Sequence, residues 1–107
     1  VKSGSLVFIS GQIPLDPKTM ELVGEDVVRQ THQVFKNLSA IAKASGGNLV
    51  DIVKMTIYLT NLDNFSKINE IMASYFQEPY PARATIEVSA LPKAALVEVE
   101  AILALEI

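Results

Sequence analysis

The stretch PYPARATIEVSALPKAALVEVEAI, residues 79–102, contains the alternation that decides the fold. Together with the following LALEI it predicts a long final strand over 96–107, because apolar residues recur at every second position. One face of this strand is apolar throughout: Val97, Val99, Ala101, Leu103 and Leu105. The opposite face is mixed: Glu98, Glu100, Ile102, Ala104 and Glu106. We expect the apolar face to pack beneath helices and the mixed face to lie on the helix-free side of the sheet.

The preceding strand, residues 82–88, alternates in the same way and raises the question of which set faces the helices. We assign its apolar set to the helix side: Ala84, Ile86 and Val88. The helix-free face then carries its polar set together with the outward residues of another strand: Arg83, Thr85, Glu87, Lys54, Thr56 and Tyr58. A sheet face that mixes polar and apolar residues is typical of a subunit interface with a polar pocket, although an ordinary solvent-exposed face has the same composition.

The other strands and two helices complete the order β-β-α-β-α-β-β. Residues 6–10 and 20–24 have strand character, and residues 51–60 alternate with an apolar side: Val53, Met55, Ile57 and Leu59. A helix beginning near Glu25 has apolar residues at helical spacing: Val27, Val28, Thr31, Val34, Phe35, Leu38, Ile41 and Ala42. Gly46 and Gly47 suit its C-terminal cap.

A second helix begins at Asp63 or Asn64, and its core side contains mainly large apolar residues: Phe65, Ile68, Met72, Tyr75 and Phe76. The order of elements predicts an α+β fold, a two-layer sandwich in which a mixed sheet carries both helices on one face. We expect residues 1–107 to form a single domain.

Composition excludes several classes of function. The chain has no cysteine, so disulfides and thiolate chemistry are excluded, and the lone His32 lies at the edge of a helix stripe, where we expect a partly solvated residue. We therefore predict neither a metal nor another cofactor. A net charge of −3 and scattered basic residues argue against nucleic acid as a partner. The sequence shows neither an apolar run of membrane length nor a secretory leader, which predicts a cytoplasmic protein, or a mitochondrial one if a targeting segment was removed.

Arg83 and Glu98 are the candidate catalytic pair. The planar guanidinium of arginine binds a carboxylate through two parallel hydrogen bonds, which lysine cannot do. A glutamate on a neighbouring strand could orient or deprotonate a water molecule. Arg83 would then anchor an anionic substrate and Glu98 would act as a general base, whereas the simpler alternative is that the two side chains pair with each other.

Three segments resemble the RidA/YjgF family of imine/enamine deaminases along essentially the whole chain. They are SGQIP at 10–14, DIVKMTIYLTNLDNFSKINEIMASYF at 51–76, and YPARATIEVSALPKAALVEVEAI at 80–102. The last contains Pro-Ala-Arg, Leu-Pro and Glu-X-Glu-Ala at the family spacing. The resemblance implies a chorismate-mutase-like fold and a homotrimer whose sheets close into a central barrel, with pockets between subunits. It also implies hydrolysis of 2-iminopropanoate, 2-iminobutanoate or their enamine tautomers to 2-oxo acids and ammonia.

The resemblance also implies roles for individual residues. Arg83 matches the arginine that grips the substrate carboxylate, Thr85 a position whose backbone N–H meets it, and Glu98 the glutamate proposed to activate water. Two further positions contribute to substrate binding: Ser10 with Gly11, which line the pocket through their backbone, and Asn69 near its mouth. Relatives also carry an upstream Gly-Pro-Tyr whose tyrosine closes the pocket, and Val1 falls just after that position.

Two other functions remain as alternatives. Some members of the family are described as endoribonucleases that inhibit translation, but the acidic balance and the lack of a basic–aromatic stripe weigh against this activity. A non-catalytic protein that binds small carboxylates would need Arg83 but not a second, water-facing acid. Glu98 therefore distinguishes the enzyme from the binding protein.

Overall fold

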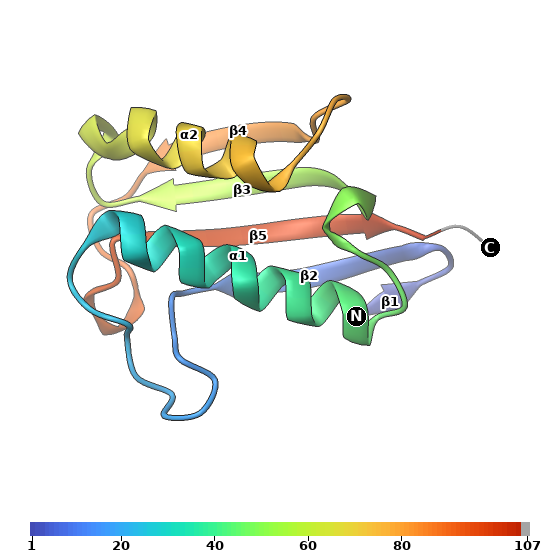
Figure 1. Ribbon diagram of the computed structural model, residues 1–107, viewed down its shortest axis with the longest axis horizontal. Helices are drawn as coiled ribbons and strands as arrows, with labels where there is room; N and C mark the ends of the chain where they lie inside the picture. The colour runs from blue at the N-terminus through green and yellow to red at the C-terminus, as the bar shows by residue number, and fades with distance from the viewer. Residues whose placement is uncertain (106–107) are drawn as a thin grey trace.

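The computed structural model describes residues 1–105, which form a two-layer sandwich. Figure 1 shows both helices, α1 (Val27–Ala44) and α2 (Phe65–Tyr75), on the same face of the sheet. The strands are β1 (Lys2–Ser3), β2 (Leu6–Gln12), β3 (Ile52–Leu59), β4 (Ala82–Glu87) and β5 (Val97–Ala104). Short 3₁₀ turns lie at Leu49–Asp51, Leu62–Asn64 and Pro92–Ala94. The predicted α+β class and the order β-β-α-β-α-β-β are confirmed, whereas the trimeric barrel stays a prediction.

The sheet is mixed, as predicted, with the strand order β1-β2-β5-β3-β4. Strands β3 and β4 are parallel and are connected through α2, while β5 is antiparallel to both of its neighbours, β2 and β3. Strand β5 therefore lies at the centre of the sheet, and β4 forms one of its edges. These two positions determine how much of each strand the helices can cover.

Helix α1 begins and ends where the sequence signals predict. The side chain of Asp26 accepts a hydrogen bond of 3.2 Å from the backbone N–H of Arg29 and so caps the first turn. At the other end Gly46 takes a left-handed φ of +95°, and its N–H donates to the carbonyl of Lys43. The N–H of Gly47 donates to Ala42 O at 2.9 Å, which completes a Schellman motif. A side chain at Gly46 would be strained in this conformation.

The core lies between the two layers. Helix α2 contributes the buried residues Ile68 and Met72, followed by Phe76, while Phe65 and Tyr75 are partly buried at its margin. From β5 the predicted apolar set is buried: Val97, Val99, Ala101 and Leu103. Leu105 packs against this cluster, whereas Glu106, which we assigned to the opposite face, lies outside the described residues.

Two strand predictions are wrong. Residues 20–24 form only an isolated bridge between Leu22 and Leu15, and the additional strand is β1, which pairs with the start of β2. In β3 the pairing register shifts between Ile52 and Lys54, so that Ile52 is buried and Val53 is 47% exposed. A bulge inserts one extra residue, so the residues before it point to the opposite face of the sheet. The alternation of the sequence alone does not reveal a bulge.

Candidate active site

The polar residues of β4 face the helix side of the sheet, opposite to our assignment. Arg83 pairs in register with Met55, Thr85 with Ile57 and Glu87 with Leu59. Paired residues share a face, and all three β3 partners are buried beneath the helices: Met55, Ile57 and Leu59. Glu87 supports this orientation, because its Oε1 accepts the backbone N–H of Leu62, in the turn before α2, at 2.9 Å.

The helix-free face is consequently more apolar than expected. Strand β4 presents Ala84 and Ile86 there, and Ile86 is 46% exposed. On β2 and β5 the same face carries Phe8, which is 44% exposed, paired with Ile102. Exposed apolar side chains on one face of a small domain indicate an interaction surface.

Arg83 is held by uncharged groups of α2. Its Nη1 donates to Asn69 Oδ1 and lies 4.0 Å from Met72 Sδ. The guanidinium carbon is 5.1 Å from the centre of the Phe65 ring, within the range of a cation–π contact. Within residues 1–105, the contacts recorded for this guanidinium include no carboxylate. An exposed arginine positioned in this way keeps its remaining N–H groups available for an anion.

The backbone of β4 adds a donor beside Arg83. Strand β4 is an edge strand, and the N–H of Val88, just past its end, donates to Leu59 O of β3 at 2.8 Å. Because successive N–H groups in a strand point to opposite sides, the N–H of Thr85 points away from β3, toward the free edge. Within residues 1–105, the buried hydroxyl of Thr85 has no hydrogen-bond partner. The backbone of Thr85, rather than its side chain, is therefore the group available to a ligand.

A cavity of about 480 Å³ opens at Arg83. Helix α2 supplies Asn69, Met72 and Ala73, and the turn before β4 supplies Tyr80 and Pro81. Its volume lies within the range of small-molecule pockets, about 300–1,000 Å³. The sequence predicts Phe65 and Met72 as core residues and gives Tyr80 no role. The signal for this helix flank is the spacing of Phe65, Asn69 and Ala73, which are four residues apart.

Ser10, Gly11 and Glu98 form a second group on the far side of the sheet. The pairing of β2 with β5 shifts between Ile9 and Gln12, so Ser10 and Gly11 lie in an irregularity of the ladder. A Cβ at Gly11 would lie 2.7 Å from Glu98 Oε2, so a side chain there would displace the carboxylate. Gly11 thus allows the glutamate to pack directly against the backbone.

Glu100 and Tyr58 lie on the same helix-free face as Glu98. The hydroxyl of Tyr58 donates to Glu100 Oε1 at 3.0 Å. The pKa of Tyr58 is raised above its usual value, mainly by this hydrogen bond, then by desolvation and by the negative charges of Glu100 and Glu98. Glu100 therefore has a partner within its own chain.

The two groups cannot meet within one chain. Strands β5 and β3 separate β2 from β4, which puts Gly11 and Arg83 roughly 14 Å apart at the usual strand spacing. Glu98 and Arg83 also project from opposite faces of the sheet. The simple ion pair between Arg83 and Glu98 is therefore wrong within one chain, whereas the roles of Arg83 as anchor and Glu98 as base stay a prediction that requires two chains.

His32 takes a structural position. Its Nδ1 lies 2.7 Å from the hydroxyl of Tyr75, so this partly buried pair connects α1 to α2, as expected of a partly solvated helix residue. Across residues 1–105, no group of three or more His, Asp or Glu side chains is arranged to hold a metal ion. None of the helices in that range is long and apolar enough to cross a membrane.

Comparison with known proteins identifies close relatives. A family model described as Endoribonuclease L-PSP matches residues 1–105. The 2-iminobutanoate/2-iminopropanoate deaminase of Dermatophagoides farinae is 41% identical over 99% of this chain and 83% of its own length. The crystal structure of RidA from a Psychrobacter species superposes with a TM-score of 0.95 at 50% identity, covering 98% of this chain and 85% of that one. Escherichia coli TdcF with bound serine gives 0.90 at 40% identity, over 99% and 85%.

Proposed function

We propose that this chain, which belongs to the RidA/YjgF family described by the Endoribonuclease L-PSP model, hydrolyses 2-imino acids and their enamine tautomers to 2-oxo acids and ammonia. The observation that carries the proposal is Arg83. Its guanidinium is exposed at a cavity, is oriented by Asn69 and Phe65, and has only uncharged contacts recorded in residues 1–105. This arrangement suits a small carboxylate as the ligand.

In the proposed reaction, Arg83 and the backbone N–H of Thr85 bind the substrate carboxylate. Water attacks the carbon of the protonated imine, forming a C–O bond, while the π electrons of the C=N bond move to the nitrogen, which carries two protons. Glu98 accepts the proton that the water loses and gives it to the nitrogen. The C–N bond then breaks, ammonia leaves, and the hydroxyl group gives its proton to Glu98 as its oxygen becomes the carbonyl of the 2-oxo acid. The backbone of Ser10 and Gly11 would line the site beside Glu98.

The reaction requires an assembly, because Arg83 and Glu98 are distant within one chain. We infer a C3 homotrimer in which the β4 edge of one subunit meets the Ser10–Gly11–Glu98 group of the next. The exposed apolar residues of the helix-free face support this arrangement, since their burial would stabilise it by about 25 cal/mol per Å². Light scattering should return three times the mass of the chain; a monomer at micromolar concentration would contradict the proposal.

A coupled assay tests the activity. Threonine dehydratase generates 2-iminobutanoate, and the formation of 2-oxobutanoate is followed with and without this protein. A faster rate at catalytic protein concentration is expected. If the protein binds 2-oxobutanoate in calorimetry but gives no acceleration, it is a carboxylate-binding protein. If the chain is instead an endoribonuclease, as the family description suggests, it should cleave RNA. The Arg83→Lys variant should then still cleave RNA.

A further inference from the structure

Gln30 is a polar side chain inside the apolar core. It lies on α1, is 1% exposed, and uses both ends of its amide. Its Nε2 donates to Gly24 O at 2.7 Å, and its Oε1 accepts the backbone N–H of Leu96 at 2.8 Å. Thr31, the next residue and also buried, instead donates to Val27 O of its own helix. Gln30 therefore connects three separate parts of the chain, whereas the bond of Thr31 stays within α1.

One of these connections holds the start of the strand that carries Glu98. Leu96 directly precedes β5 and lies two residues before Glu98. The pairing of β2 with β5 ends at Gln12 opposite Val99, before it reaches Leu96. Gln30 supplies the acceptor for the Leu96 N–H beyond the end of that pairing. A buried backbone N–H requires such a partner, so the position of this segment depends on Gln30.

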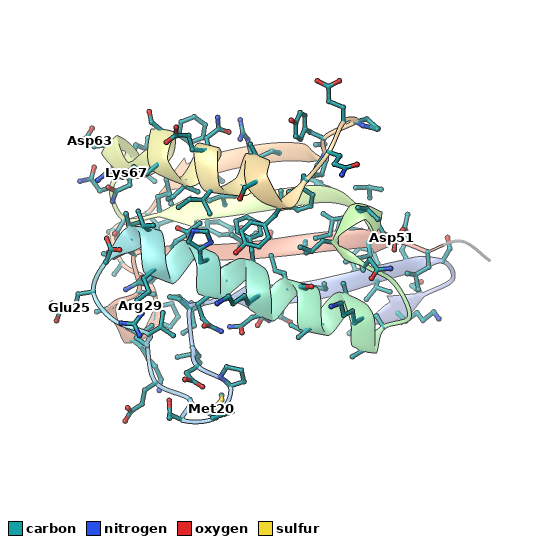
Figure 2. All side chains as sticks on the ribbon, viewed as in Figure 1. Met20, Glu25, Arg29, Asp51, Asp63 and Lys67 are labelled. Atoms are coloured by element: carbon teal, nitrogen blue, oxygen red, sulfur yellow. The ribbon has the colours of Figure 1, made fainter. Side chains whose placement is uncertain are left out.

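The other connection holds the loop between β2 and α1. Gly24 lies near the end of this loop and takes a φ of +128°, in the range that favours glycine. A second hydrogen bond joins the same loop to the turn before β5, because Lys93 Nζ donates to Met20 O at 3.1 Å. Figure 2 shows Met20 at the far end of the loop. The loop after β2 and the turn before β5 are thus joined twice, by Gln30 in the core and by Lys93 at the surface.

We propose that Gln30 is a positioning residue for the acid half of the site, which consists of Ser10, Gly11 and Glu98. The inference rests on the proposed deaminase function. A Cβ at Gly11 would lie 2.7 Å from Glu98 Oε2, so the two residues fit with little tolerance. Gln30 holds both the loop that follows Gly11 and the strand that carries Glu98. A misplacement of about 1 Å can lower a catalysed rate by up to about a hundredfold. Arg83 is held by α2 instead, so Gln30 should affect turnover and leave carboxylate binding unchanged.

Gln30→Met tests the inference, because it keeps the length of the side chain and removes both hydrogen bonds. In the coupled assay with threonine dehydratase, turnover should fall by about tenfold, while the calorimetric affinity for 2-oxobutanoate should stay within about twofold of wild type. Thr31→Val is the matched control, since it removes a buried hydrogen bond at the neighbouring position, and its turnover should equal that of wild type. Thermal unfolding should show a loss of stability in both variants, so instability alone cannot produce the difference in turnover.

Gln30→Glu should restore turnover to within about threefold of wild type. Burial favours the neutral acid, which can still accept from the Leu96 N–H and donate to Gly24 O. If Gln30→Met does not assemble, Gln30→Asn takes its place, because its amide is one methylene shorter and cannot reach both partners at once. Gln30→Asn should then show the same loss of turnover and the same affinity for 2-oxobutanoate.

Refolding of mixed variants tests which half of the site Gln30 serves. In the proposed trimer, Gln30→Met refolded with Arg83→Lys should give wild-type sites in roughly a quarter of cases, because the two changes lie in different halves. Gln30→Met refolded with Glu98→Gln should give no more than the average activity of the two variants, because both changes lie in the same half. Recovery with Glu98→Gln, or with neither variant, would overturn the inference.

Wild-type turnover in Gln30→Met, or an equal loss of turnover in Thr31→Val, would also overturn it. If wild type hydrolyses no imine, the proposed function fails, and amide hydrogen exchange still decides whether Gln30 holds the start of β5. In Gln30→Met the Leu96 amide should exchange about fivefold faster or more, while the Val88 amide at the end of β4 should be unaffected. A Leu96 amide that exchanges at the wild-type rate would reject the inference.

Discussion

Strands β4 and β5 have similar alternating sequences, but β4 turns its polar side chains toward the helices and β5 its apolar ones. In β5, at the centre of the sheet, the apolar set is buried and the glutamates face away from the helices. In β4, at the edge, the polar set faces the helix side, and Ala84 and Ile86 face away. The helices cover the centre of the sheet completely, whereas at the edge only the flank of α2 is present. Polar side chains can therefore point toward the helix layer at an edge and still reach solvent and ligand.

The difference shows that alternation fixes the period of a strand but not which face is buried. It also explains how the candidate site is divided. The edge strand holds the anion-binding group beside α2, and the central strand holds the acid on the opposite face. Each group is incomplete alone, and the following predictions test whether they work together.

The largest effect is expected for Glu98→Gln, which removes the proposed base and keeps the shape. Turnover should fall by about 10² or more, while the affinity for 2-oxobutanoate should stay close to that of the wild type. Turnover and calorimetry measure the two quantities separately. Glu25→Gln, an exposed glutamate near the start of α1 in Figure 2, is the control. Unchanged turnover in the Glu98 variant would remove Glu98 from the mechanism.

Arg83→Lys tests the edge strand. The substitution keeps the charge but loses the planar contact with Phe65 and the two-point grip on a carboxylate, so kcat/KM should fall about tenfold to a thousandfold. This corresponds to roughly 1.4–4 kcal/mol of transition-state binding. Arg29→Lys, at the exposed start of α1, should have no effect. Equal activity in both variants would make Arg83 a surface residue without a catalytic role.

Mixing the Arg83→Lys and Glu98→Gln variants tests whether the two groups come from different chains. If Arg83 of one subunit works with Glu98 of the next, unfolding and refolding Arg83→Lys together with Glu98→Gln should restore roughly a quarter of the sites. Activity should rise accordingly, while each variant refolded alone keeps its reduced rate. A site contained in one chain predicts no recovery. The trimer must be present by light scattering in all three samples.

The turn between β4 and β5 offers a smaller, structural test. Lys93 and Ala94 both adopt left-handed φ angles, +57° and +58°. Ala94→Gly should relieve strain of about 1–2 kcal/mol, partly offset by the entropy of glycine in the unfolded chain, for a net gain of up to about 1 kcal/mol. The same change at the exposed helical Ala40 should instead destabilise by about 1 kcal/mol. Chemical denaturation measures both, and a loss of stability at Ala94 would contradict the strain argument.

The smallest effect is expected for Thr85→Val. In the described part of the chain the buried hydroxyl of Thr85 has no hydrogen-bond partner, so replacing it with a methyl group removes an unsatisfied polar atom and preserves the shape. The free energy of unfolding should change by less than about 1 kcal/mol, in the stabilising direction. A clear destabilisation would mean that the hydroxyl has a partner in the assembled protein.

The sequence by itself determined both helices, most of the strands and most of the core. The boundaries of α1 follow from Asp26 and the Gly46–Gly47 pair, because these residues satisfy backbone groups locally. The buried face of β5 follows from its uninterrupted apolar set, since no other arrangement hides those side chains from water. The local motifs are sufficient to indicate the family and the candidate residues, including Arg83 and Glu98.

Only the tertiary structure decided where those residues lie. The face of β4 depends on its pairing with β3 and on how far α2 reaches over the edge, and neither is a property of its own alternation. The position of Val53 depends on a bulge. The N-terminal strand pair forms between the neighbouring segments β1 and β2, whereas residues 20–24 form a single bridge despite their strand character. The contacts of Arg83 with Phe65, Asn69 and Met72 likewise require a helix flank and a strand edge to be brought together by packing. The sequence gives the chemical character of each side chain. The face of the sheet on which a side chain lies depends on which elements cover that face, and the whole fold determines this.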